Sequence, residues 1–91
     1  MRESTVEKGI VAYAKSKGVT AQKQNGLHNR GKADQLLMRN GVAAFLEIKR
    51  PDEEPTPLQY RYLKQREADG FAAGWANTVE MGKDFIDRVF P

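Results

Sequence analysis

The dipeptide Asn40-Gly41, set between two apolar runs, constrains this chain more than any other feature. Residues 34–39 and 42–49 flank the dipeptide, which is the pair best suited to a two-residue type I′ hairpin turn. Such a turn fixes the register of the two strands and places Asp34 directly opposite Glu47. Both runs carry apolar side chains on both faces, which is typical of central strands covered on two sides.

The open end of this hairpin gathers charged side chains on one face. Lys49 follows Glu47 by two residues and so shares its face of the strand. Like charges directly opposite each other, as Asp34 and Glu47 would be, destabilise a strand pair by about 1 kcal/mol or less. The fold alone has no need of such a pair, whereas Mg²⁺ requires carboxylate oxygens. A structural salt bridge from Lys49 to one acid is the alternative, but it does not account for the second acid.

These residues resemble a known signature. Asp34 followed by Glu47-Ile48-Lys49 resembles the PD-(D/E)XK nuclease superfamily. The lead-in Gly31-x-x-Asp34 and the continuation Thr56-Pro57-Leu58-Gln59 are similar to the VRR-NUC branch of that superfamily. The resemblance covers nearly the whole chain and rests on the ordered set of motifs, because a Glu-x-Lys alone is common by chance.

The resemblance implies a nuclease that depends on Mg²⁺ or Mn²⁺. Asp34, Glu47 and the backbone carbonyl of Ile48 would hold the ion, which polarises the scissile phosphate and activates water. Lys49 would position the water or stabilise negative charge, and Gln59 would assist. Small stand-alone relatives look like Holliday-junction-cleaving enzymes, which implies a homodimer acting on branched DNA. The alternatives are a nuclease that cuts flaps or nicks duplex DNA, and a DNA-binding module without catalysis.

Local signals predict the other elements. Ser4-x-x-Glu7 and Thr56-x-x-Gln59 both read as capping boxes at helix starts, and Gly18 and Gly70 read as helix ends. Between and after these helices, the pattern predicts a strand over 19–24, a strand over 71–77 and a helix over about 79–90. The order α-β-β-β-α-β-α matches a restriction-endonuclease-like core, an α/β fold with a mixed four-stranded sheet flanked by helices. Ninety-one residues make one domain, 1–91.

Two of these side chains admit a structural and a functional interpretation. Glu7 either caps its own helix or reaches the metal site as a third carboxylate, through water or directly; Glu3 is the competing acid, placed ahead of the helix. Gln59 either completes the capping box or places its amide beside Lys49 to orient water or phosphate. For Gln59 the two interpretations are compatible with each other.

The charge distribution favours a nucleic-acid partner. The net charge is +3, with 15 basic and 12 acidic residues, which is only mildly basic. Basic side chains gather just before Asp34, the first acid of the motif, and along the predicted second helix. The candidate DNA contacts among them are Arg30, Lys32, Arg61 and Lys64. The sequence contains no cysteine, no apolar run of membrane length and no signal-peptide pattern. We therefore expect a cytoplasmic protein without membrane contact. The resemblance to small stand-alone phage and bacterial relatives implies a bacterial cell or a phage-infected host.

Overall fold

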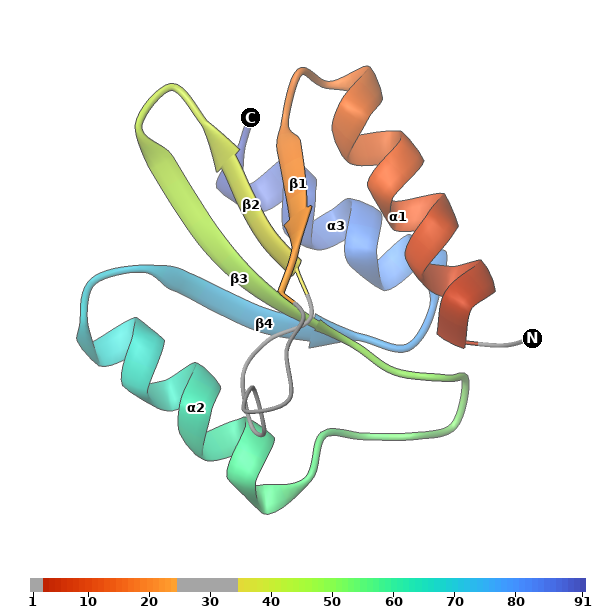
Figure 1. Cartoon of the computed structure of the whole chain (residues 1–91), viewed down its shortest axis with the longest axis vertical. Coiled ribbons are helices and arrows are strands. Elements are labelled where there is room, and N and C mark those ends of the chain that lie inside the picture. The colour runs from red at the N-terminus through yellow and green to blue at the C-terminus, as the bar shows by residue number, and fades with distance from the viewer. Residues whose placement is uncertain (1–2, 25–34) are drawn as a thin grey trace.

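The computed structural model describes residues 3–24 and 35–91, with the backbone alone at Glu3 and Ser4. Within these ranges the chain forms three helices and four strands in the order α-β-β-β-α-β-α (Figure 1). The elements are α1 (Glu3–Ser16), β1 (Thr20–Lys23), β2 (Gln35–Arg39), β3 (Val42–Ile48), α2 (Pro57–Ala68), β4 (Ala72–Ala76) and α3 (Val79–Val89). The described strands form one mixed sheet in the order β1-β2-β3-β4, in which only the β3–β4 pair is parallel. The predicted fold class and element order are confirmed.

The hairpin between β2 and β3 has the register that its turn predicts. Asn40 and Gly41 both have positive φ, at 51° and 82°, as a type I′ turn requires. The antiparallel pairs run from Arg39 opposite Val42 to Gln35 opposite Leu46. Asp34, predicted to face Glu47, lies outside the described residues.

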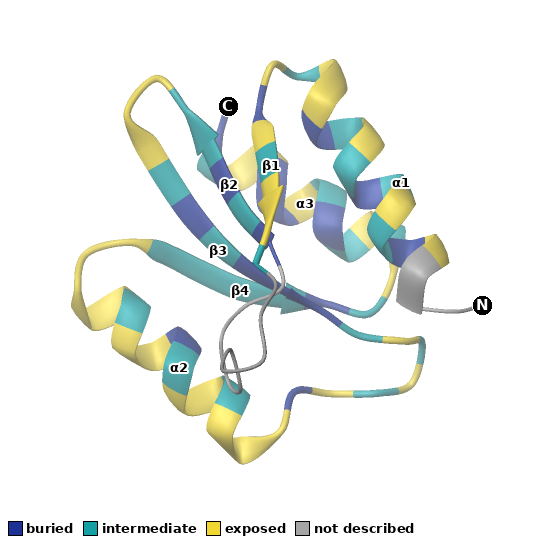
Figure 2. Cartoon of the chain, viewed as in Figure 1, coloured by how far each residue is buried: buried dark blue, intermediate teal, exposed yellow. Residues whose placement is uncertain are grey.

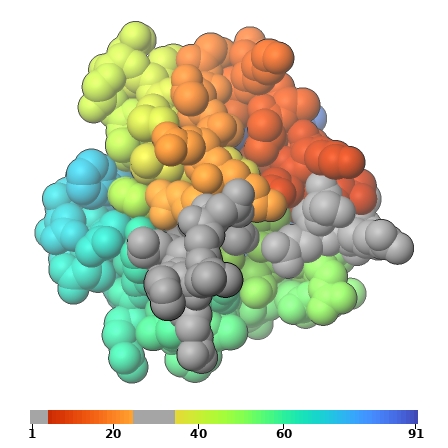
Figure 3. Space-filling model, in the orientation of Figure 1, coloured from red at the N-terminus to blue at the C-terminus, as the bar shows by residue number. Residues whose placement is uncertain are grey.

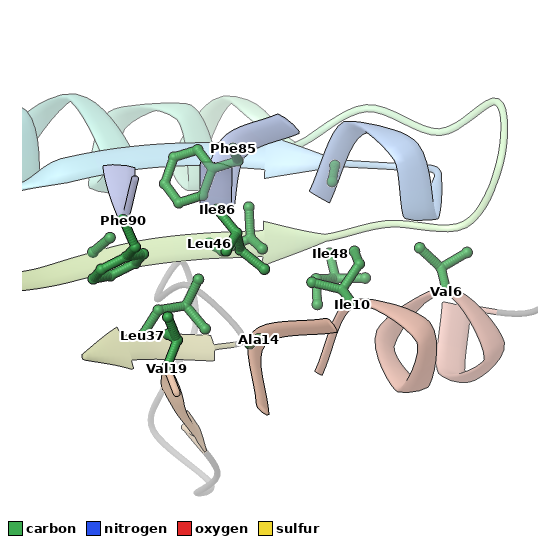
Figure 4. Packing of buried hydrophobic residues seen from close by; sticks show 12 residues of the cluster. Val6, Ile10, Ala14, Val19, Leu37, Leu46, Ile48, Phe85, Ile86 and Phe90 are labelled. Atoms are coloured by element: carbon green, nitrogen blue, oxygen red, sulfur yellow. The ribbon is translucent and has the colours of Figure 1, made fainter. Parts of the chain in front are cut away.

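One face of the sheet carries the hydrophobic core. Buried residues recur along β3 (Figure 2), and the side chains of Leu46 and Ile48 lie in the core (Figure 4). The helices α1 and α3 cover this face. The buried cluster consists of Val6, Ile10, Ala14, Val19, Leu37, Ala44, Leu46, Ile48, Ala76, Phe85, Ile86 and Phe90. Burial of this apolar surface is the main term that holds the two helices on the sheet.

Close approach of α1 to α3 depends on a small residue. A Cβ atom at Gly82 would lie 2.4 Å from Cδ1 and Cγ1 of Ile10, well inside van der Waals contact. Glycine at this position therefore lets α3 approach the buried side chain of Ile10 on α1. A side chain there would force the helices apart or push Ile10 from its rotamer.

The first helix begins earlier than predicted. Ser4 lies inside α1, which starts at Glu3, so the expected capping box from Ser4 to Glu7 is wrong, and so is the placement of Glu3 ahead of the helix. The predicted end is confirmed, because Gly18 has a φ of 73°. Its N–H donates to Lys15 O at 3.0 Å and Val19 N–H donates to Ala14 O at 2.9 Å, which is the Schellman pattern.

The other face of the sheet is covered by α2. Phe45, which alternates with the core residues of β3, meets Tyr62 of α2 edge-on, with ring centroids 6.1 Å apart. In the space-filling view, α2 occupies one part of the visible face, and α1 and β1 together occupy another part (Figure 3). Among the described helices, none has both the length and the apolar character needed to cross a bilayer.

Candidate active site

The end of β3 farthest from the hairpin turn carries Glu47 and Lys49. Glu47 is only 2% exposed, and Ile48 is the last residue of the strand. Glu47 alternates with the core residues and so leaves the sheet on the α2 face, the same face as Phe45. A carboxylate buried this deeply is tolerated only beside positive charge or hydrogen-bond donors. A divalent cation is one charge that meets this requirement.

The backbone at the end of β3 turns a carbonyl toward β2. The N–H of Lys49 donates to Ala76 O of β4 at 2.9 Å. The peptide bond between Ile48 and Lys49 is trans, since the described chain has no cis bond, so its C=O points away from its N–H. Because β3 lies between β2 and β4, the Ile48 carbonyl points to the side of β2.

Gln59 performs the structural role and also contacts Lys49. Its Oε1 accepts a hydrogen bond from Thr56 N at 2.8 Å, while Gln59 N donates to Thr56 Oγ1 at 3.2 Å. This reciprocal pair confirms the predicted capping box at the start of α2. The same Oε1 lies 3.5 Å from Lys49 Nζ, a long contact that still places the ammonium group at the helix start. In the described part of the chain Lys49 forms no ion pair with an acid.

Glu7 faces the sheet. Its Oε2 accepts a hydrogen bond from Gln35 Nε2 at 2.9 Å, and its Oε1 forms an ion pair with Lys23 Nζ at 3.1 Å. Glu7 thus ties α1 to the neighbouring strands β1 and β2. Gln35 follows Asp34 directly in the sequence and is 3% exposed. Gln35 was not among the predicted site residues, although it shares the predicted apolar face of its strand with Leu37, and a polar side chain on such a face is a signal of a special role.

The remaining predicted site residues divide between the described and undescribed parts of the chain. Arg61 and Lys64 are exposed on α2, where a nucleic-acid backbone could reach them. Asp34, Arg30 and Lys32 lie outside the described residues. The ligand set that was predicted for the metal includes Asp34, and the described side chains alone contain no group of three His, Cys, Asp or Glu residues able to hold an ion.

The donors present at this strand end suit a hard divalent cation. Glu47 supplies carboxylate oxygens and Ile48 a backbone carbonyl, the ligand types that Mg²⁺ and Mn²⁺ favour. The chain has no cysteine, so a thiolate site for a soft metal is excluded. The chemistry of the donor set therefore fits the expected ion.

Comparison with known proteins gives the family. No family model matches the sequence. A protein of Acyrthosiphon pisum secondary endosymbiont phage 1, named "Putative nuclease p44", is 39% identical over 62 residues, which cover 67% of each chain. A solved structure of a VRR-NUC domain has the same fold, with a TM-score of 0.83 over 97% of both chains and 21% identity. Together with the motif at the end of β3, the phage relative and the shared fold show that this chain belongs to the VRR-NUC family.

Proposed function

We propose that the protein is a metal-dependent endonuclease that hydrolyses phosphodiester bonds of DNA. The observation that carries the proposal is the end of β3, where a carboxylate that is 2% exposed precedes a lysine in contact with Gln59 at the start of α2. The family supports nuclease activity, and the name of the phage relative agrees with it. The dependence on metal and the preferred DNA structure are parts of our proposal.

Glu47 and the carbonyl of Ile48 would hold Mg²⁺ or Mn²⁺ together with Asp34. The ion would supply charge for the scissile phosphate and a bound water of lowered pKa. Lys49 presents an ammonium group with three donors, of which one points to Gln59 at 3.5 Å. The other two can donate to a phosphate oxygen or to the attacking water. Gln59 limits the positions that this flexible side chain adopts.

We infer the substrate and the assembly from the resemblance to small stand-alone relatives and from the size of the domain. One site of this kind cuts one strand, and a domain of 91 residues cannot readily enclose a branched duplex. A two-fold homodimer would present two sites to two strands, which suits a Holliday junction. Arg61 and Lys64 are exposed on α2 and can contact phosphates beside the site. The phage relative is consistent with action inside a bacterial cell or a phage-infected host.

Incubation of the purified protein with defined DNAs tests the proposal. The substrates are a four-way junction, a flap, a linear duplex and a single strand, each with Mg²⁺, Mn²⁺ or EDTA. We expect cleavage of the branched DNAs that requires the metal. Salt-dependent binding without cleavage under every condition would instead identify a non-catalytic DNA-binding module.

A lysine substitution assigns the chemistry to this strand end. Lys49→Ala removes the ammonium group, and we expect cleavage of the best substrate to fall at least 100-fold, as for loss of one electrostatic donor (about 10²–10³). Lys15→Ala, at an exposed position in the last turn of α1, is the matched control and should cleave normally. Near-normal cleavage by Lys49→Ala would show that the chemistry lies elsewhere. Light scattering at micromolar concentration tests the dimer, and a strict monomer would contradict it.

A further inference from the structure

Two aromatic side chains lie beside the candidate active site. Trp75 on β4 pairs in register with Glu47 on β3, and neighbouring strands lie about 4.8 Å apart. Paired residues direct their side chains to the same face of a sheet, so Trp75 leaves the sheet on the α2 face, next to Glu47. Tyr60 follows Gln59 directly in α2, and its ring meets the Trp75 ring edge-on, with centroids 6.5 Å apart. The candidate active site therefore has an aromatic pair as its neighbour.

The two rings keep faces that no other aromatic ring and no cation in the described ranges covers. In an edge-to-face pair one ring presents its edge, so the contact occupies a single face of the partner ring. The other two tyrosine rings, Tyr13 and Tyr62, each lie near a cationic side chain. Within residues 3–24 and 35–91, no such contact reaches Tyr60 or Trp75. Tyr60 is 36% exposed and Trp75 is half-buried, so the pair is open to a flat ligand from solvent.

The aromatic pair is held in place by its surroundings. The Tyr60 hydroxyl donates to Glu54 Oε1 at 3.0 Å, and Glu54 belongs to the connection between β3 and α2. Tyrosine and tryptophan each have only two side-chain torsions, so holding them in one position costs little entropy. The Glu54 carboxylate also repels a phosphate at the tip of the Tyr60 ring. A neutral base is therefore the part of a nucleotide that suits these rings.

An unpaired DNA base is the ligand that fits this pair. Every base has a flat π-face that stacks on aromatic side chains, largely without regard to sequence. In a continuous duplex each base is already paired and stacked, and taking it out costs free energy, which is least for a mismatched or single-stranded base. Lys64 is exposed one turn beyond Tyr60 on the same side of α2, so it can contact a phosphate of the same strand. The surroundings of the pair thus suit a strand whose bases are unpaired.

We propose that Tyr60 and Trp75 form a stacking platform for an unpaired base next to the scissile phosphate. The platform selects DNA that has unpaired nucleotides at the cut, such as a fork or a flap, over continuous duplex. The proposal rests on the nuclease function proposed above and names the substrate class of that same site. Tyr60 and Trp75 determine the choice of substrate in this account and take no part in breaking the bond.

The fluorescence of Trp75 reports directly on the platform, because Trp75 is the only tryptophan in the sequence. The wild-type protein is titrated in EDTA with a forked DNA that has unpaired arms and with a blunt duplex of the same length. We expect saturable quenching by the fork and at least fivefold weaker binding of the duplex, the effect of one stacked base. Equal affinity for the two DNAs, or unchanged fluorescence with both, would overturn the inference.

Substitution of Tyr60 tests its part in the platform. Tyr60→Leu removes the ring from an exposed position, and we expect the fork to bind about 5- to 150-fold more weakly, as for loss of one stacked base, with duplex binding unchanged. The preference for cleaving fork over duplex should fall by a similar factor. Tyr60→Phe retains the ring and should retain the preference. Leu58→Ala is the matched control, because Leu58 is an exposed apolar residue in the first turn of the same helix, and it should behave as the wild type does.

The outcomes separate this inference from the proposed function. A Tyr60→Leu protein that is folded by circular dichroism and keeps the wild-type preference would overturn the inference, and the aromatic pair would then serve only to join α2 to the sheet. If Tyr60→Leu does not fold, the fluorescence titration of the wild type decides the case, since it needs no variant. A wild-type protein that cleaves no DNA with any metal would overturn the proposed nuclease, while binding in EDTA would still decide whether the pair stacks on unpaired bases.

Discussion

Replacing Gln59 by glutamate separates the structural role of this side chain from its role at the candidate active site. Its Oε1 accepts from Thr56 N at 2.8 Å and lies 3.5 Å from Lys49 Nζ. A carboxylate accepts the Thr56 hydrogen bond equally well and completes the same capping box. It also adds a negative charge at a helix N-terminus, which is favourable by about 0.3–1 kcal/mol. We therefore expect the free energy of unfolding of Gln59→Glu to be equal to or slightly above that of the wild type.

The effect on cleavage has the opposite sign. Unit charges 3.5 Å apart attract by about 1 kcal/mol in water and by about 5 kcal/mol at an effective dielectric constant of 20. Lys49 is half-buried, so a value near the lower end is appropriate for the pair. An introduced carboxylate would hold the Lys49 ammonium group away from phosphate by roughly 1–2 kcal/mol, which corresponds to about 5- to 30-fold slower cleavage.

Gln59→Ala provides the complementary variant. It loses the hydrogen bond to Thr56 N, which is exposed, and we expect a loss of about 1 kcal/mol in unfolding free energy. Its cleavage should fall less than that of Gln59→Glu, because no charge competes for Lys49. Two separable roles predict a specific pattern. Only Gln59→Ala should lose stability, and Gln59→Glu should lose the most cleavage activity.

The assays are urea unfolding followed by circular dichroism and single-turnover cleavage of the preferred DNA. Gln65→Glu is the charge-matched control, since Gln65 is exposed on the same helix, and it accounts for general repulsion of DNA. If Gln59→Glu cleaves as fast as the wild type, the contact between Gln59 and Lys49 has no part in the reaction.

Two predictions concern the fold. Gly82→Ala places a methyl group 2.4 Å from Ile10 side-chain atoms, so it should destabilise the fold by about 1–3 kcal/mol and lower the Tm by roughly 5 °C or more. Calorimetry should show that adding Ile10→Val restores part of the Tm. An unchanged Tm in Gly82→Ala would contradict the packing argument. Hydrogen bonds from Lys17 and then Tyr13 lower the pKa of Asp87 below its ordinary value of 3.8. The charged Asp87 carboxylate therefore stabilises the fold in full above pH 3.8, and this stabilisation is lost as the pH falls through the lowered pKa. In urea unfolding, the difference in unfolding free energy between the wild type and Asp87→Asn should be constant near neutrality and should narrow below pH 3.8. A difference that persists unchanged in strong acid would refute this.

Local signals predicted the hairpin and the second helix correctly. Asn40-Gly41 determines the register because few other dipeptides adopt positive φ at both positions, and the observed pairs follow that register. Thr56 and Gln59 form their capping box because both partners lie within one turn of the same helix. In each case the residues that decide the structure are close together in the sequence, so the pattern contains the answer.

The first helix shows where local signals fail. Ser4-x-x-Glu7 has the same spacing as Thr56-x-x-Gln59, yet Ser4 lies inside α1. Glu7 instead accepts hydrogen bonds from Gln35 and Lys23, which lie 28 and 16 residues away. A carboxylate held by two partners on the sheet cannot also reach back to its own helix start, so tertiary contacts decide the role of this side chain.

The candidate site depends on both kinds of information. The motif identified Glu47, Lys49 and Gln59 as candidates. The structure places Glu47 and Lys49 at the end of β3, where the Lys49 N–H pairs with β4, and places Gln59 Oε1 3.5 Å from Lys49 Nζ. The same pairing brings the end of β3 beside Ala76, the last residue of β4, whose parallel course is set by the α2 crossover. Gln59 lies in the first turn of α2, and α2 connects these two strands. A change in the length of the β3–α2 connection would therefore move Gln59 away from Lys49 while leaving the sheet register intact. The geometry of the site is therefore more sensitive to this connection than the fold is.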